Sequence, residues 1–477
     1  MVLGASSNAG KTLVCASLCC AAHNMLVNAM PFKAQNMCGS TVTTCDGFEI
    51  SVAQWLQAAG CGVEASVLMN PVVVKPARCG ASRLLVGGEV ASESFVYPGS
   101  RRFRARLRLQ VLASALKLSS QCKLVVVEGA GAASEVNLSA FDLSNMWLAS
   151  ALRCDVVLVV DVERGGALAA VAGARQLLTE TQSSMVIGFV LNRFVGKLSL
   201  LMPGVRALEA LTSWPCLGVL PKVDGAFRLP HEDALSRDRA PLASKLVVVV
   251  VDLPLAIGAG DVDALKLEPG LSVEVLKTPP SRVLPNLKLV VLPDAASPAA
   301  SVEFLNLSGW PQYLARVRDA GVLVLAIGTS FVALCRRYAW GVVECQLAPG
   351  LALLNTHALG ADVARYALRC ECALLAARVH ATSSKLVVCL DAWSSKLEPL
   401  IVWEGAAWGV RSGNVWGVNV DGLFACDEFR IALLLSLGVA PKVIRFSDSV
   451  RRALLNVATE LTPHFSARLL AKLAAAC

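Results

Sequence analysis

The chain of 477 residues is 55% hydrophobic and only 17% charged, with a formal net charge of +8. This much apolar surface excludes intrinsic disorder, and the composition also excludes collagen, coiled coils and small disulfide scaffolds. The length predicts two or three domains.

The mean hydropathy of +0.58 raises the question of membrane insertion. The longest uncharged stretch, residues 12–32, contains a histidine, two asparagines and a proline. The next, residues 320–335, has 16 residues, fewer than the ~20 of a spanning helix. No charged region typical of a signal peptide comes first. We therefore expect no membrane insertion, a cytoplasmic location and reduced, buried cysteines among the 17 in the chain.

Short β-branched runs alternate with longer stretches rich in alanine and leucine, which predicts an α/β fold with parallel sheets. Strands are expected at residues 1–3, 124–127, 156–161, 186–191, 246–251, 287–292 and 322–327. Residues 231–245 are charged, contain a proline and lack apolar periodicity. We place a domain boundary near residue 240, which gives domains at 1–240 and 246–477.

The first predicted strand leads into the sequence GASSNAGKT at residues 4–12, and a helix is expected to open at Lys11. Backbone N–H groups in such a turn can hold phosphate oxygens, a lysine can reach the terminal phosphates and a threonine can bind Mg²⁺. The residues predicted to bind nucleotide are Gly4, Ser6, Ser7, Asn8, Gly10, Lys11 and Thr12. Five residues rather than four separate the two glycines, as in the loops of dethiobiotin-synthetase-like, amide-forming enzymes.

Glu128 follows the predicted strand at residues 124–127. An acid at the carboxyl end of a parallel strand lies where such sheets bind ligands, so Glu128 is a candidate Mg²⁺ ligand or catalytic group, or an ordinary strand-end acid. Asp46 and Glu49 are further candidate metal ligands. The basic run at residues 101–108 fits a solvated helix face better than a nucleic-acid surface, because no nucleic-acid-binding motif accompanies it. We expect no nucleic-acid partner.

The segment PFKAQNM at residues 31–37 resembles the PFKPQNM motif of the cobyric acid synthase family, with one substitution. Other segments resemble motifs of that family in the same order. They lie at residues 46–50, 53–54, 69–76, 127–131, 135–138, 142–146, 161–166, 191–194, 218–221 and 229–233.

The resemblance implies a fold of two doubly wound, mainly parallel-sheet domains, the first a dethiobiotin-synthetase-like P-loop domain and the second like a class I glutamine amidotransferase. It also implies ATP- and Mg²⁺-dependent amidation of four peripheral carboxylates of (adenosyl)cobyrinic acid a,c-diamide through acyl phosphates, as a step in cobalamin biosynthesis. Lys11 and Glu128 would be catalytic. The residues suited to hold the corrinoid substrate are Lys33, Gln35, Asn36, Gln54, Asn70, Lys75, Asn137, Asn145, Arg164 and Asn192.

The second half resembles the amidotransferase domain of the family but lacks its catalytic residues. The family's cysteine elbow, similar to GICGGYQ, aligns with residues 324–332 and puts Gly328 at the cysteine position. The family's histidine position is occupied by Asp421, and its LPGSK turn reads LPDAA at residues 292–296. An aspartate cannot act as the imidazole base that makes a thiolate. We therefore predict no glutaminase activity, with ammonia free or supplied by a separate glutaminase.

Groups that could replace a lost nucleophile or base have little support in the sequence: His357 and His380 lack a partner motif, and Ser330 is two positions out of register. The candidates are Ser330, Cys335, His357 and His380, of which Cys335 is expected on a helix that directs it away from the elbow. A second hypothesis is a scaffold that binds ATP or corrinoid without chemistry, which substitutions such as Ala34 and Phe48 within the motifs would allow. A partitioning-type P-loop ATPase would explain the loop but not PFKAQNM.

Overall fold

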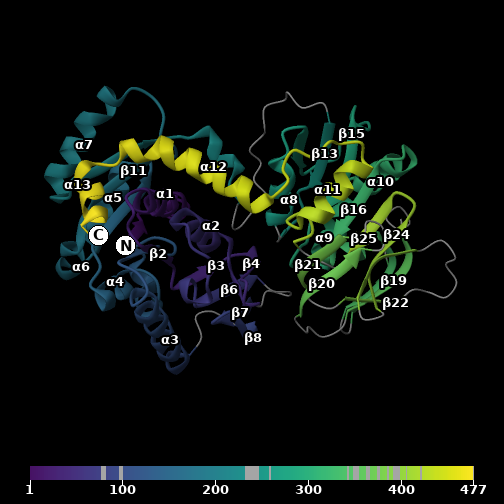
Figure 1. Ribbon diagram of the computed structural model, residues 1–477, viewed down its shortest axis with the longest axis horizontal. Coiled ribbons are helices and arrows are strands. Elements are labelled where there is room, and N and C mark those ends of the chain that lie inside the picture. Colours follow the sequence, from purple (N-terminus) through teal and green to yellow (C-terminus); the bar gives the residue numbers. More distant parts are fainter. Residues whose placement is uncertain are drawn as a thin grey trace. The chain divides into compact units, whose positions relative to one another are not determined.

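The computed structural model describes residues 1–475, apart from 77–81, 96–99, 231–245, 257–258, 341–342, 347–353, 361–365, 373–376, 384–385, 390–397, 404–405 and 419–421 (Figure 1). The chain forms two compact units. The first contains Met1–Lys75, Ala81–Leu229 and Val450–Cys477, and the second is built mainly from Pro230–Ser449. The boundary that we expected near residue 240 lies outside the described residues. The last 28 residues, expected in the second domain, belong to the first unit instead.

A parallel sheet forms the centre of the first unit, in the order β1 (Val2–Gly4), β10 (Val156–Asp161), β11 (Val186–Phe194) and β12 (Cys216–Pro221). Beside it, β2 (Ala29–Phe32) pairs in parallel with β9 (Leu124–Val127). A parallel bridge between Val2 and Glu128 joins the two sheets. The strands are apolar along their length because helices cover both faces of the sheet.

The helices of this unit are α1 (Lys11–Asn24), α2 (Val52–Cys61), α3 (Arg101–Ser119), α4 (Met146–Leu152), α5 (Ala167–Leu177), α6 (Glu180–Ser184) and α7 (Leu198–Thr212). A smaller sheet has the order β3 (Gln35–Met37), β6 (Val72–Pro76), β7 (Ser82–Val86) and β8 (Glu89–Phe95). A hairpin-like pair consists of β4 (Thr41–Thr43) and β5 (Glu49–Ser51). Short 3₁₀ helices are η1 (Val67–Met69), η3 (Val136–Phe141) and η4 (Asp224–Arg228).

The C-terminal helix α13 (Ala467–Ala474) and the part of α12 (Phe446–Leu461) from Val450 onward complete the first unit (Figure 1). Between them, the backbone N–H of Ser466 donates to Leu217 O at 2.7 Å, and Phe465 bridges to Gly218 at β12. A side chain at Gly218 would lie 2.6 Å from the carbonyl oxygen of His464, so the glycine permits this approach. The apolar face of α12 is buried against this unit, which explains why the segment returns to it.

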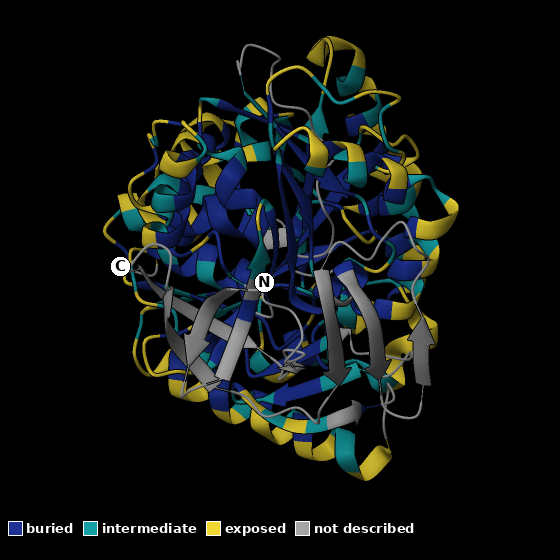
Figure 2. Cartoon of the chain, turned by 90° about the vertical axis from the view of Figure 1, so that its right-hand side faces the viewer, coloured by how far each residue is buried: buried dark blue, intermediate teal, exposed yellow. Residues whose placement is uncertain are grey.

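The second unit has a nine-stranded sheet. Its first five strands are parallel, in the order β14 (Leu271–Leu276), β13 (Leu246–Val251), β15 (Leu287–Leu292), β16 (Leu323–Ile327) and β25 (Val415–Val418). An antiparallel extension follows, made of β24 (Ala406–Ser412), β23 (Glu398–Trp403), β20 (Tyr366–Cys372) and β21 (Ala377–Ser383). Figure 2 shows the central strands as buried and the outer faces of the helices as exposed.

The helices of the second unit are α8 (Ala259–Lys266), α9 (Pro298–Leu307), α10 (Trp310–Asp319) and α11 (Asp427–Ser436). A separate mixed sheet has the order β18 (Val343–Gln346), β17 (Cys335–Trp340), β19 (Leu354–Gly360) and β22 (Leu386–Cys389). Cys335 therefore begins a strand, and its expected position on a helix is wrong. The strands predicted at residues 156–161, 246–251 and 287–292 are confirmed with those bounds. Within the described ranges, no helix combines the length and apolarity needed to cross a bilayer.

The placement of α12 can be tested with Leu454→Ala. Leu454 is fully buried, and removing its side chain should lower the free energy of unfolding by about 2–5 kcal/mol. If the loop at residues 4–12 binds ATP as expected, the loss should appear in the unfolding transition that added ATP shifts, because Leu454 belongs to the same unit as this loop. Leu109→Ala, at an exposed leucine, is the matched control. A loss confined to the ATP-insensitive transition would contradict this assignment.

Candidate nucleotide and amidation site

The loop between β1 and α1 is shaped by its glycines. Gly10 has a φ of +90°, and a side chain there would overlap the amide of Asn192. A side chain at Gly4 would lie 3.0 Å from Lys11 Nζ and 2.6 Å from Ser6 O. Both positions therefore require glycine. Lys11 Nζ donates to Gly131 O at 2.8 Å, which holds the ammonium beside the loop.

The nucleotide-binding residues predicted from the sequence all lie in this loop or in the first turn of α1. Ser6, Ser7 and Asn8 are exposed, so a ligand can reach this part of the loop. The loop leads directly into the start of α1, where unpaired backbone N–H groups and the helix dipole favour a phosphate. The strand, loop and helix follow one another as the sequence predicted, and the binding of a nucleotide by these residues stays a prediction.

The carboxylate of Glu128 accepts hydrogen bonds from three segments of the chain. Its side chain is 1% exposed, and its Oε1 accepts hydrogen bonds from Thr12 Oγ1 at 2.9 Å and Lys33 Nζ at 2.8 Å. Gln57 Nε2 donates to Oε2. The carboxylate thus joins α1, the segment after β2 and α2. Sequence reasoning missed Gln57; the available signal was a second glutamine one helical turn after Gln54 in an otherwise apolar helix.

The residues predicted as metal ligands do not form one cluster. Thr12 and Glu128 lie together and offer the hydroxyl and carboxylate oxygens that Mg²⁺ prefers. Glu49 instead accepts hydrogen bonds from Lys75 Nζ at 3.1 Å and Thr41 Oγ1 at 2.9 Å, and Asp46 is exposed on a turn. In the part of the chain that the structure describes, no three acidic, histidine or cysteine side chains group as metal ligands.

Several predicted substrate residues make hydrogen bonds within the protein. Asn70 Nδ2 donates to Lys33 O at 3.0 Å, and its Oδ1 accepts from Ser51 N at 3.1 Å. Gln54 is fully buried and bonds with Ser51, which caps α2. Lys75 pairs with Glu49. These bonds fix the segment that carries Lys33 relative to α2.

Polar groups from β10 and β11 border the other side of the loop. Asn192 Nδ2 donates to Ala9 O at 2.9 Å, and Arg193 Nη1 donates to Asn8 O at 3.2 Å. Arg193 also pairs at 2.7 Å with Asp161, which is 5% exposed and was not among the predicted site residues. Arg164 lies 3.6 Å from the same carboxylate and is largely exposed.

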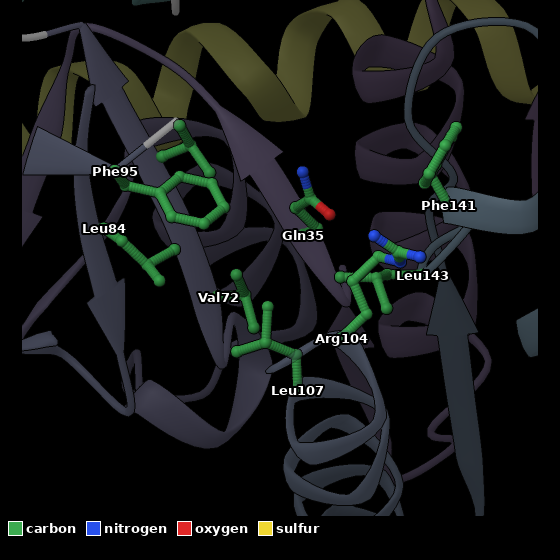
Figure 3. A pocket seen from close by; sticks show the side chains of 9 residues that line it. Gln35, Val72, Leu84, Phe95, Arg104, Leu107, Phe141 and Leu143 are labelled. Carbon is green, nitrogen blue, oxygen red and sulfur yellow. The ribbon is translucent and has the colours of Figure 1, made fainter. Parts of the chain in front are cut away.

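The remaining predicted substrate residues occupy three different environments. Asn145 exchanges hydrogen bonds with the backbone of Ala130, at 3.0 Å and 2.6 Å, and so fixes the turn after Glu128. Asn137 is exposed on η3, and Asn36 is buried. Gln35 lines a small, mainly apolar pocket together with Arg104 (Figure 3).

The basic run at residues 101–108 begins α3, and its arginines differ in environment. The Arg104 guanidinium lies 4.6 Å from the centre of the Phe141 ring, and the Arg108 guanidinium is equally far from that of Trp147. Arg101, Arg102 and Arg106 are exposed. Two of the arginines therefore hold α3 against the segment that follows Glu128.

Cys15, which lies on α1 near Glu128, is fully buried. Burial raises the pKa of its thiol well above the ordinary value, and the negative charge of Glu128 raises it further. The group therefore stays a neutral thiol at physiological pH and does not act as a nucleophile.

In the second unit, Gly328 lies at the turn after β16 and has a φ of +61°. A side chain at this position would overlap the carboxylate of Asp294. Asp294 Oδ1 accepts from Thr329 N at 2.7 Å, Thr329 Oγ1 at 2.8 Å and Ala295 N at 2.8 Å. The turn has the left-handed backbone of an elbow, but an internal carboxylate fills the space above it.

Of the groups considered as replacements, the structure describes the side-chain contacts of Ser330. Ser330 is fully buried, and its hydroxyl donates to Pro293 O. His357 lies on β19 and His380 on β21. Asp421, at the predicted histidine position, lies outside the described residues.

The fold and loop define the first unit as a P-loop nucleotide-binding domain. Residues 1–235 match the family described as the CobQ/CobB/MinD/ParA nucleotide binding domain. Among solved structures, a glutamine amidotransferase crystal structure matches with a TM-score of 0.34 at 18% identity, covering 40% of this chain and 99% of its own. The MinD cell division protein of Aquifex aeolicus matches with a TM-score of 0.28 at 10% identity, covering 47% of this chain and 82% of its own.

Three curated relatives, each called cobyric acid synthase, match nearly the whole chain. The protein of Rhizobium etli (strain CIAT 652) is 33% identical over 493 residues, covering 99% of both chains. That of Mesorhizobium japonicum is 35% identical and covers 97% of both. That of Sphingopyxis alaskensis is 35% identical and covers 100% of this chain and 99% of its own. The chain belongs to the cobyric acid synthase family.

The overlap at the elbow predicts coupling between positions 328 and 294. Gly328→Ala should destabilise the second unit by more than the about 1 kcal/mol that a left-handed backbone costs alanine. Gly438→Ala is the matched control, since Gly438 has a φ of +74° and open space around it. In an Asp294→Gly background the cost should fall towards that of the control. Chemical denaturation of the four variants measures this coupling, and equal costs of Gly328→Ala in both backgrounds would contradict it.

Proposed function

We propose that the chain is an ATP-dependent amide ligase of cobalamin biosynthesis that acts as a cobyric acid synthase on peripheral carboxylates of (adenosyl)cobyrinic acid a,c-diamide. The observation that carries the proposal is the arrangement around Glu128, whose carboxylate binds Thr12 of the phosphate loop and the ammonium of Lys33. Membership of the cobyric acid synthase family supports this choice of substrate.

The proposed reaction solves a chemical problem, because a carboxylate is a poor electrophile. Transfer of the terminal phosphoryl group of ATP to a substrate carboxylate oxygen would give ADP and an acyl phosphate. Ammonia would then form the new C–N bond as phosphate leaves, and one proton of the ammonia would be released. Phosphoryl transfer depends on alignment and charge stabilisation, which Lys11 and the loop N–H groups are placed to supply.

The oxygen atoms of Thr12 and Glu128 fit Mg²⁺. The ion would neutralise negative charge on the nucleotide phosphates. Lys33 shares Glu128 Oε1 with Thr12, so its ammonium balances the buried carboxylate in this structure. We keep Asp46 and Glu49 out of this proposed set because they do not cluster with Glu128.

Substrate binding is proposed for the side of the site that carries the family-like motifs. Gln35 and Asn36 lie two and three residues after Lys33, and Asn137 and Arg164 are exposed where a large ligand could contact them. Asn70, Lys75 and Asn145 would act through the shape of these segments, because their side chains bond within the protein, as does Oε1 of Gln54. Asn192 would act on the phosphate loop through Ala9.

We further propose that the second unit does not hydrolyse glutamine. Gly328 offers no nucleophile, and the Asp294 carboxylate accepts hydrogen bonds from two backbone N–H groups at the elbow, those of Ala295 and Thr329. Two converging N–H groups are what stabilises an oxyanion in acyl transfer. Ammonia would therefore come from solution or from a separate glutaminase.

The role of the phosphate loop can be tested with Lys11→Ala. Removing a charge that stabilises phosphoryl transfer should lower ammonia-dependent amide formation by about 10²–10³-fold. Lys117→Ala, at an exposed lysine of α3, is the control and should keep the full rate. Amide products are counted by mass spectrometry. An undiminished rate in Lys11→Ala would contradict this role.

The nitrogen donor is tested by supplying the purified protein with ATP, Mg²⁺ and cobyrinic acid a,c-diamide. Product should form with ammonium and not with glutamine freed of ammonia, and a separate active glutaminase should restore the use of glutamine. Turnover with purified glutamine alone would overturn the loss of glutaminase activity. Tight corrinoid binding without product from either donor would favour a scaffold over a ligase.

A further inference from the structure

The two carboxylate oxygens of Glu128 accept hydrogen bonds from groups of different charge. Its Oε1 receives Thr12 and the cationic Lys33, whereas its Oε2 receives the neutral amide of Gln57. Since Glu128 is 1% exposed, water cannot easily replace a lost donor. Gln57 thus fixes the direction of the carboxylate without cancelling its charge.

The orientation of the Gln57 amide follows from chemistry. An ionised carboxylate only accepts hydrogen bonds, so the Gln57 atom that faces it is Nε2, and Oε1 faces away. Gln57 is fully buried, and within the described structure its Oε1 has no hydrogen-bond partner. A buried amide oxygen of this kind is normally satisfied by a bound water or ligand. The nitrogen of the Gln57 amide therefore binds Glu128, and its oxygen remains an acceptor for a water or a ligand.

We propose that Gln57 is a positioning residue that orients Glu128 so that Oε1 faces Thr12 and the phosphate loop. This inference rests on the proposed ligase function. It predicts that a donor is needed at position 57, and not merely a side chain of the right volume. Gln57→Leu removes the donor, and Gln57→Glu keeps the shape but donates only when it is protonated.

The pH profile separates a positioning role from a structural one. A carboxyl pair at hydrogen-bond distance shares one proton, so in Gln57→Glu the donor is present at low pH and lost as the pH rises. Among the other titratable groups, Lys33 contacts Glu128 and Cys15 interacts with it electrostatically, and the wild type also has both. In Gln57→Glu, the plot of kcat against pH should therefore show a decrease that the wild type lacks. Above the apparent pKa of the two carboxyl groups, kcat should fall by up to tenfold per pH unit.

The experiment compares the full-length wild type with Gln57→Leu, Gln57→Glu and the exposed control Gln110→Glu. Gln57→Leu should lower kcat for ammonia-dependent amidation by about 10- to 100-fold at every pH, with the KM for the corrinoid little changed. Gln57→Glu should approach the wild-type kcat only at the acid end of the profile. The control should follow the wild-type profile.

A second readout does not need amidation. Binding of a fluorescent ATP analogue, titrated with Mg²⁺, should require about 10- to 100-fold more Mg²⁺ in Gln57→Leu. If the wild type forms no amide but this shift is seen, the proposed ligase function fails and the positioning role of Gln57 stands. A wild-type kcat and Mg²⁺ dependence in Gln57→Leu, or a pH-independent loss in Gln57→Glu, would overturn the inference.

Discussion

The buried carboxylate of Glu128 is the constraint on which the first unit depends. A charge that is 1% exposed must be paired and hydrogen-bonded, and the donors come from α1, α2 and the segment after β2. These segments are far apart in the sequence. Through Glu128, the hydrogen bond of Thr12 and the ion pair of Lys33 connect the start of α1, next to the phosphate loop, with the motif at residues 31–37. Loss of Glu128 alone would remove the carboxylate that pairs with the buried ammonium of Lys33.

The second unit shows a different case, in which buried polar contacts lie away from the turn at Gly328, where we propose that a nucleophile is missing. Arg430 is fully buried, and its guanidinium donates to Asp427, Phe424 O and Val443 O. Glu268 accepts from the backbone of Lys442 and Val443. Such contacts hold a fold whether or not it catalyses a reaction, because removing one partner leaves a buried charge.

Sequence periodicity was enough to predict the parallel strands, because strands covered on both faces read as continuous apolar runs. The loop residues and Glu128 were also predictable, since they follow strands at the edge where ligands bind. The return of α12 to the first unit was not, because an amphipathic helix does not specify which sheet it covers. Gln57 and the pairing of Lys33 with Glu128 depend on side chains brought together only by the fold.

The two sites also differ in what their internal contacts imply about ligands. At Glu128, Oε1 accepts from a hydroxyl and an ammonium next to exposed loop residues, so the cation and nucleotide that we propose would enter by replacing or rearranging these donors. At Gly328, one oxygen of Asp294 already receives three donors, and no side chain fits at the turn. A ligand that bound there would have to displace the Asp294 carboxylate. Because this carboxylate is part of the chain, its effective concentration at the turn is far above that of a free ligand. The first arrangement is suited to turnover, and the second is suited to holding the elbow in a fixed form.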